Sequence, residues 1–272
     1  LTYVVLGLVA YLTTPFAAAK AHPLSASDAD WVPWALQIIL RNYGVMIFAY
    51  GGWHAFLQAN AAVMQHLKFN PAPTTQHHLT REYLFTTLGF LVGSLFEVAM
   101  VNLWATGYVT YLSTEEAVSR PWFSLLHLFG IAYWRDGHFW FVHRLMHKGF
   151  VVFGFDLGAF LYKHVHSLHH LSRNPTTWSG LSMHPVEHLL YYTCTLTPLV
   201  FNLHPMHFTV NLMHAFVSPA PGHDGYDYPG GGSRFHYLHH TLVDVNFGTP
   251  MVPFDLLFGT YKDPGLAVAK AA

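Results

Sequence analysis

Three histidine groups constrain this chain more than any other feature of its sequence, because the residues between them must fold so that the groups meet. The groups are HRLMH from His143, HSLHH from His166 and HYLHH from His236. If these segments are helical, residues three and four apart lie on one face, so each group directs two or three imidazoles at one point. Imidazole is the commonest metal-binding side chain, and the spacing therefore predicts a metal site.

Composition places that site in a membrane protein. Of the 272 residues, 52% are hydrophobic and only 10% are charged, whereas a soluble domain has roughly 25% charged residues. The formal net charge is -1, which gives no indication of a nucleic-acid partner. Cys194 is the single cysteine, so an internal disulfide is excluded.

The apolar stretches predict an all-α, integral membrane helical bundle. Residues 1–19, 34–64 and 83–111 are long enough to cross the hydrocarbon, and a fourth apolar helix begins near Pro121 and leads to the first histidine group. Two shorter apolar segments, 186–203 and 206–217, favour a re-entrant helical hairpin. We therefore expect about four transmembrane helices and a re-entrant hairpin, with residues 1–120 as N-terminal transmembrane helices and 121–272 as a catalytic domain.

The distribution of charge predicts the orientation of this bundle. Basic residues gather in residues 64–83 and 135–173, whereas the opposite loops carry the acidic residues Asp28, Asp30, Glu115 and Glu116. The positive-inside bias puts the basic side, and with it a histidine-rich cap, in the cytosol. Glu97 lies within the third predicted span, where an ionisable group is costly. It is either functional, or it lies near the membrane interface or pairs with Asn102.

The motifs around the histidines resemble a known family. They are HRLMH from His143, YKHVHSLHH ending at His170, NPTTWSGLSMHPVE from Asn174, PGHDGYDYP from Pro221, FHYLHH from Phe235 and NFGTPMVPFDLLFGT from Asn246. Together they resemble the fatty acid hydroxylase and sterol desaturase superfamily of membrane-bound, histidine-rich di-iron oxygenases. The match runs from about Trp134 to Tyr261. The three residues between His143 and His147 resemble the sterol and sphingoid-base branch of that superfamily.

The resemblance implies a site with two iron ions, which need about ten protein ligands if water or substrate fills the remaining positions. The candidate ligands are His143, His147, His166, His169, His170, His184, His223, His236, His239 and His240. His188 and Asp227 are further candidates. A ligating histidine usually donates its other N–H to a carboxylate or a carbonyl. The carboxylates expected as such partners are Asp136, Glu187, Asp224 and Asp244.

The activity implied by the resemblance is oxidation of a lipid. Such an enzyme hydroxylates or desaturates an unactivated C–H position with O2 and electrons from an outside donor, such as cytochrome b5 or a ferredoxin and its reductase. A sterol or sphingoid-like substrate is favoured, and a fatty acid or carotenoid hydroxylase of the same chemistry is the alternative. The membrane is either the endoplasmic reticulum or a bacterial inner membrane, with the active site on its cytosolic face.

Two other classes of protein compete with this interpretation. A zinc-dependent membrane hydrolase usually carries an HExxH helix, but Arg144 occupies the position of its glutamate. A membrane carrier of haem or metal needs only two to four ligands. Because imidazole binds iron and zinc alike, zinc could replace iron in a purified sample. The metal content of the protein therefore discriminates these three classes.

Overall fold

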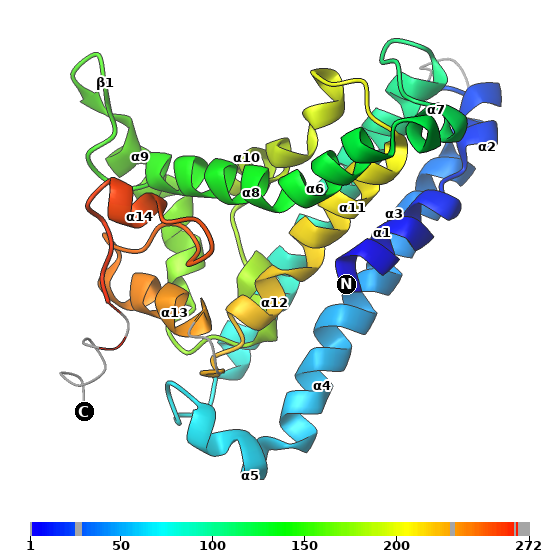
Figure 1. Cartoon of the computed structure of the whole chain (residues 1–272). Helices are drawn as coiled ribbons and strands as arrows, with labels where there is room; N and C mark the ends of the chain where they lie inside the picture. Colours follow the sequence, from blue (N-terminus) through cyan, green and yellow to red (C-terminus); the bar gives the residue numbers. More distant parts are fainter. Residues whose placement is uncertain (1, 25–28, 229–231, 264, 266–272) are drawn as a thin grey trace.

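The computed structural model describes residues 2–24, 29–228, 232–263 and 265, and its regular structure is almost entirely helical (Figure 1). Within these residues the only strands are β1 (Val151–Val152) and β2 (Phe155–Asp156), which pair as one antiparallel hairpin. The predicted all-α class is therefore confirmed. Asp28 and Pro229, which entered the charge and motif arguments, lie outside the described residues.

Within the described part of the chain, two helices are long and apolar enough to cross a membrane. The first, Val32–Ala59, consists of α3 (Val32–Met46), a π-helical turn (Ile47–Gly51) and α4 (Gly52–Ala59). The second is α6 (Gln76–Ala105), which begins where the Thr75 hydroxyl accepts a hydrogen bond from the backbone N–H of His78. These helices correspond to the second and third predicted spans, and α3 packs against α6.

The first predicted span differs in the structure, so the single helix expected over residues 1–19 is wrong. α1 (Thr2–Leu12) and α2 (Phe16–Ala21) are separate helices. The hydroxyls of Thr13 and Thr14 donate to carbonyls of the preceding turn, and Pro15 has no N–H with which to continue the helix. The 11 residues of α1 rise about 16 Å, which is less than the roughly 30 Å of the hydrocarbon.

α11 (Pro205–Val217) is the core of the bundle, because almost all of its residues are buried. It contacts α1, α6 and α8 (Pro121–Leu145) (Figure 1). α1 approaches closely at Gly7, where a Cβ atom would lie 2.5 Å from the Cα atom of Val210. The second arm of the predicted re-entrant hairpin is thus enclosed by other helices. Its first arm consists of α10 (Pro185–Tyr192) and two 3-10 turns, Thr193–Thr195 and Thr197–Leu199.

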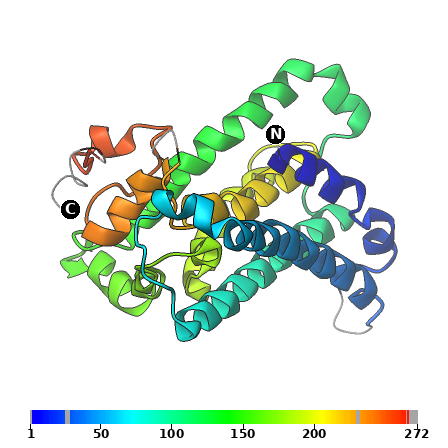
Figure 2. The same ribbon diagram turned by 90° about the horizontal axis from the view of Figure 1, so that it is seen from below.

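The predicted acidic turn over residues 113–120 contains a short helix, α7 (Thr114–Ser119), which begins with a capping box between Ser113 and Glu116. Pro121 then occupies the first turn of α8, as the sequence predicts. α8 carries Arg135, Asp136 and Arg144 and is not among the two candidate spans. It leads from α7 to the side of the molecule where the last helices lie (Figures 1 and 2).

The remaining elements are short. They are α5 (Ala61–Met64), the 3-10 turn Gln65–Leu67, α9 (Leu157–His164), the 3-10 segments His166–Leu171 and Thr177–Leu181, α12 (Pro219–Gly222), α13 (Gly232–Leu242) and α14 (Phe254–Leu257). Of these, α9, α13 and α14 lie on the side of the molecule toward which α8 runs (Figure 1). Short elements joined by turns place the three histidine motifs close together in space.

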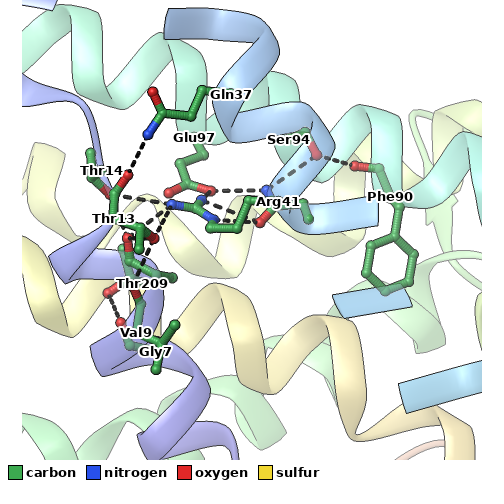
Figure 3. Close-up of polar contacts among 12 residues, drawn as sticks. Gly7, Val9, Thr13, Thr14, Gln37, Arg41, Phe90, Ser94, Glu97 and Thr209 are labelled. Atoms are coloured by element: carbon green, nitrogen blue, oxygen red, sulfur yellow. Dashed lines mark hydrogen bonds and ion pairs between the residues drawn. The ribbon is translucent and has the colours of Figure 1, made fainter. Parts of the chain in front are cut away.

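Glu97 is part of a buried polar cluster between α1, α3 and α6 (Figure 3). Its Oε2 atom lies 2.5 Å from Nη2 of Arg41 and accepts from Nδ2 of Asn42 at 2.9 Å. Arg41 also donates to the carbonyl of Ala10. The predicted pairing with Asn102 is wrong, because the Asn102 side-chain oxygen accepts from the backbone N–H of Leu24. Glu97 therefore joins helices by an ion pair.

Candidate metal centre

Nine histidines form two adjacent groups. The five-histidine group consists of His143, His147, His166, His170 and His239, and the four-histidine group consists of His169, His223, His236 and His240. In each group the ring nitrogen atoms that the residues offer all lie within 4.8 Å of one another. The ring centroids of His170 and His240, one from each group, are 4.8 Å apart. The structure thus brings the three histidine motifs to one place.

The local backbone at these motifs is only partly helical. His143 is in the last turn of α8, and His147 lies in the turn beyond its end. The second motif is a 3-10 segment, and only the third motif is on an α-helix, α13. Helical spacing therefore applies to the third motif, whereas the loops position the histidines of the first two motifs.

Backbone carbonyls fix the tautomers of three imidazoles. His143 donates from Nδ1 to the carbonyl of Phe247 at 2.6 Å, and His239 donates from Nδ1 to the carbonyl of Val245 at 2.7 Å. In the other group His223 donates from Nδ1 to the carbonyl of Pro219 at 3.0 Å. Because a carbonyl oxygen can only accept, each of these neutral rings keeps its lone pair on Nε2.

Burial keeps the imidazoles neutral. It lowers the pKa of His166, His169, His236, His239 and His240 well below the ordinary value, and repulsion among the neighbouring histidines acts in the same direction. The pKa of His170 is lowered to about 3 and that of His223 to about 4, with burial as the largest cause in both cases. At pH 7 the rings are neutral, which is the form that binds metal.

The Nε2 atoms of the five-histidine group converge on one point. Nε2 of His143 lies 3.0 Å from Nε2 of His166, and Nε2 of His239 lies 3.1 Å from Nε2 of His170. His143 and His239, whose Nδ1 atoms donate to carbonyls, present lone pairs at Nε2 toward that point. A metal ion there would be coordinated by these lone pairs. The residues present therefore fit a metal ion.

Unpartnered nitrogen atoms support the same conclusion. Among the described residues, neither ring nitrogen of His147 has a hydrogen-bond partner, although both are buried. The Nε2 atom of His223 is also buried without a partner. A buried polar atom without a partner costs about 1–3 kcal/mol. Coordination of a metal would remove that cost.

Of the four carboxylates expected beside the ligands, only Glu187 contacts a histidine of either group. Its Oε1 atom lies 2.8 Å from Nδ1 of His166, and burial raises the pKa of this carboxyl well above its ordinary value. The expected role is wrong for the other three, because each holds a different partner. Asp136 accepts from Thr249, Asp224 accepts from Trp53 and Tyr228, and Asp244 pairs with Lys148.

Three candidate ligands do not join either group. The side chain of His184 accepts from the backbone N–H of Val186 and so caps α10. Nε2 of His188 lies 3.1 Å from the carbonyl of Phe85, and its ring packs where a Cβ atom on Gly89 would lie at 2.5 Å. Asp227 forms an ion pair with Arg234. His188 therefore joins α10 to α6.

Two carboxylates that the sequence analysis did not identify hold the loops of the site. Asp255 accepts from the backbone N–H groups of Phe247 and Gly248 at 2.9 and 2.8 Å, and so positions the carbonyl that receives His143. Glu82 accepts from the hydroxyls of Ser172 and Thr176, just after the second motif. Asp255 lies inside a matched motif, and Glu82 is an acidic residue at the edge of a predicted span. The matched motif and the position beside an apolar stretch are the sequence features that could have identified Asp255 and Glu82.

An apolar cavity of about 220 Å³ adjoins the four-histidine group. His223 and His236 form part of its wall, and Arg135 is its one charged lining residue. The rest of the wall is mostly apolar, with Phe139, Met183, Tyr191, Pro219, Phe235 and Pro250 among the lining residues. A smaller pocket next to it reaches His143, His166 and Glu187. The arrangement can hold an apolar molecule beside metal ions.

Comparison with known proteins agrees with this geometry. Residues 128–260 match the model of the family described as fatty acid hydroxylase. The lathosterol oxidase of Rattus norvegicus is 26% identical over 84% of this chain and 75% of its own length. A Delta(7)-sterol 5(6)-desaturase of Leptosphaeria maculans is 25% identical over 86% of this chain and 64% of its own length.

A third relative comes from the sphingoid-base branch. Sphinganine C4-monooxygenase 1 of Arabidopsis thaliana is 33% identical over 45% of this chain, but that match spans only 46% of the relative's own length. No solved structure matches the chain.

Proposed function

We propose that this chain hydroxylates or desaturates an unactivated C–H position of a lipid. The premise is that it belongs to the fatty acid hydroxylase and sterol desaturase superfamily and is an oxygen-dependent oxidoreductase. The observation that carries the proposal is the pair of buried, neutral histidine groups next to an apolar cavity. Neutral imidazoles offer ligands for metal ions, and the cavity offers a place for an apolar chain or ring.

The proposed ligands are the nine histidines of the two groups, with one iron ion in each group. Two iron ions held there would supply activation of O2 and removal of hydrogen from an unactivated carbon, with electrons from an outside donor such as cytochrome b5 or a ferredoxin. His184, His188 and Asp227 are not included, because none of them lies in either group and each contacts residues outside both groups.

The protein's own residues then have three tasks in this proposal. The carbonyls of Val245 and Phe247, together with Glu187, orient the imidazoles. Phe139, Met183 and Tyr191 surround the substrate and exclude water from the reacting carbon. Residues 121–272, which carry all nine histidines, form the proposed catalytic unit.

The names of the relatives support a sterol or a sphingoid-like lipid as the substrate. A fatty acid or carotenoid is the alternative within the same chemistry. The two apolar helices support a place in a membrane, either the endoplasmic reticulum or a bacterial inner membrane. The basic residues near the histidine motifs support an active site on the cytosolic face.

The test combines metal analysis with lipid profiling. The full chain is purified, loaded anaerobically with ferrous iron, and supplied with O2, a reductant and a sterol or sphingoid lipid. We expect about two iron ions per chain and a product that is either hydroxylated or desaturated. A protein that binds one zinc ion and hydrolyses an ester or amide would instead be a hydrolase. One that binds one haem without oxidising any lipid would be a carrier.

A further inference from the structure

Among the described residues that line the cavity beside the four-histidine group, the one cationic residue is Arg135. It lies on α8, eight residues or about two turns before His143. Its side chain is only 11% exposed. A guanidinium group cannot lose its proton at ordinary pH. The cavity therefore holds a permanently charged hydrogen-bond donor.

The contacts of Arg135 leave part of its donor capacity free. Nη1 donates to the hydroxyl of Tyr191 at 3.1 Å, and that hydroxyl donates its own hydrogen to the carbonyl of Ala215 at 3.0 Å. The Nε atom of Arg135 is buried and has no hydrogen-bond partner among the described residues. Tyr191 therefore fixes the guanidinium group in place at the cavity wall, and the protein does not satisfy all of its N–H groups.

The charge around Arg135 indicates which kind of acceptor fits. Nη2 lies 3.9 Å from Oδ1 of Asp136, so an ion pair already balances the guanidinium charge. Oδ2 of Asp136 accepts from Thr249, which also lines the cavity. A carboxylate or phosphate brought into this cavity would leave one uncompensated negative charge in an apolar site. A neutral hydroxyl oxygen would accept the hydrogen bond without that cost.

We propose that Arg135 is the residue that recognises the hydroxyl group of the lipid substrate, by donating a hydrogen bond to the hydroxyl oxygen. The inference rests on the proposed function and deepens it. The hydroxyl is held at the Arg135 end of the cavity, the apolar body lies against Phe139, Met183 and Phe235, and the carbon to be oxidised lies toward His223 and His236. The substrate class is thus a hydroxylated lipid, such as a sterol or a sphingoid base, and not a free fatty acid.

The experiment measures binding and turnover of matched lipids by the iron-loaded full chain in lipid nanodiscs. The probes are lathosterol, sphinganine, the analogue of each in which a hydroxyl is replaced by hydrogen, and stearate. Binding is followed by the shift of the thermal unfolding midpoint with lipid concentration. We expect the wild type to bind at least one hydroxylated probe about tenfold or more tightly than its hydrogen analogue.

The variants are Arg135→Met, which removes the donors but keeps the length of the side chain, and Arg135→Lys, which keeps a charged donor. We expect Arg135→Met to bind both members of the pair as the wild type binds the hydrogen analogue, with unchanged iron content and a raised KM. Arg135→Lys should restore part of the discrimination. Arg120→Met is the matched control at the exposed residue that immediately precedes α8 and should behave as the wild type.

The outcomes separate this inference from the proposed function. If the wild type oxidises a lipid but Arg135→Met keeps the preference for the hydroxyl, or if stearate binds most tightly, the role of Arg135 is overturned and the oxygenase remains. If the preference depends on Arg135 but no lipid is oxidised, the lipid site stands and the proposed reaction falls. Loss of iron from both Arg135 variants would make the residue structural and would overturn the inference.

Discussion

Two of the places where the molecule buries polar side chains are the histidine centre and the cluster around Arg41 and Glu97, which Figure 3 shows. In the second cluster opposite charges meet, since Glu97 pairs with Arg41 and accepts from Asn42. In the histidine centre like groups meet, since the Nε2 atoms of neutral imidazoles lie 3.0 and 3.1 Å apart in the pairs His143–His166 and His239–His170. One cluster balances its own charge, and the other offers ligands to a cation from outside the chain.

This difference separates a structural cluster from a site. An acidic residue within a membrane span is a functional candidate by default, yet Glu97 forms an ion pair with Arg41 of the neighbouring helix. The histidines have no such counter-charge except Glu187 beside His166. A buried polar group thus points to a ligand when its neighbours are groups of the same type, as with the imidazoles. It points to helix packing when its neighbour carries the opposite charge, as with Glu97 and Arg41.

The largest expected effect comes from removal of one imidazole of the centre. His239→Ala deletes a ring that faces His170 and that the carbonyl of Val245 orients. We expect the iron content of the protein to fall by about one ion per chain or more and lipid oxidation to be lost, by a factor of about 100 or more. Metal analysis and product assays of the purified variant measure both quantities.

His188→Ala is the control for that variant, because it deletes another fully buried imidazole outside both groups. We expect it to lower the thermal unfolding midpoint, since α10 loses its contact with α6, while the iron content stays the same. Iron loss from His188→Ala at the same level as from His239→Ala would remove the distinction between the two kinds of buried histidine.

The next effect concerns the balanced cluster. Glu97→Gln leaves the Arg41 charge buried without its partner, so we expect the free energy of unfolding to fall by about 3–5 kcal/mol. The iron content per folded chain should not change, because no atom of this cluster belongs to the histidine groups. Chemical denaturation of the protein in mild detergent measures the first quantity.

The double variant Arg41→Met with Glu97→Met tests whether the loss of stability comes from the unpaired charge of Arg41. Because it removes both charges, it should be more stable than Glu97→Gln alone. Full stability of Glu97→Gln combined with loss of turnover would give Glu97 a functional role, and the comparison between the clusters would fail.

A smaller effect is expected where α9 supports the centre. A Cβ atom on Gly158 would lie 1.9 Å from the carbonyl oxygen of His147, so Gly158→Ala must displace the backbone of a proposed ligand. We expect a loss of about 1–3 kcal/mol in stability and weaker iron binding. Gly130→Ala on α8, where no atom lies within 4 Å of the added carbon, should cost neither. Equal behaviour of the two variants would contradict this packing.

The smallest effect is expected at Glu187. Glu187→Gln keeps an oxygen that can accept from Nδ1 of His166 but replaces the ionisable carboxyl with an amide, so we expect iron affinity to fall by about 10- to 100-fold. Asp244→Asn, whose carboxylate contacts Lys148 and no histidine of the centre, is the control. Competition with a chelator of known affinity measures both variants. A similar loss in both would show that Glu187 has no special role.

The motifs allowed a large part of the site to be predicted. The three histidine groups, His223 and Glu187 could be named as candidates from residue type, spacing and resemblance, because only a few types of side chain bind or orient metal ligands in any fold. The helices α6 and α8 and the first-turn position of Pro121 could be predicted from apolar runs and from the chemistry of proline. His184 could not be excluded in this way, since only its contact with Val186 shows that it caps a helix.

The sequence by itself determined which side chains are available to bind metal and which stretches are apolar. Only the tertiary structure decided that carbonyls of residues 245 and 247 orient the rings, that Asp255 holds their loop, and that Arg41 neutralises Glu97. The physical reason is that composition and spacing are local properties of the chain. A hydrogen bond or an ion pair depends on which distant atoms meet, and here more than 100 residues separate His143 from the carbonyl that holds it.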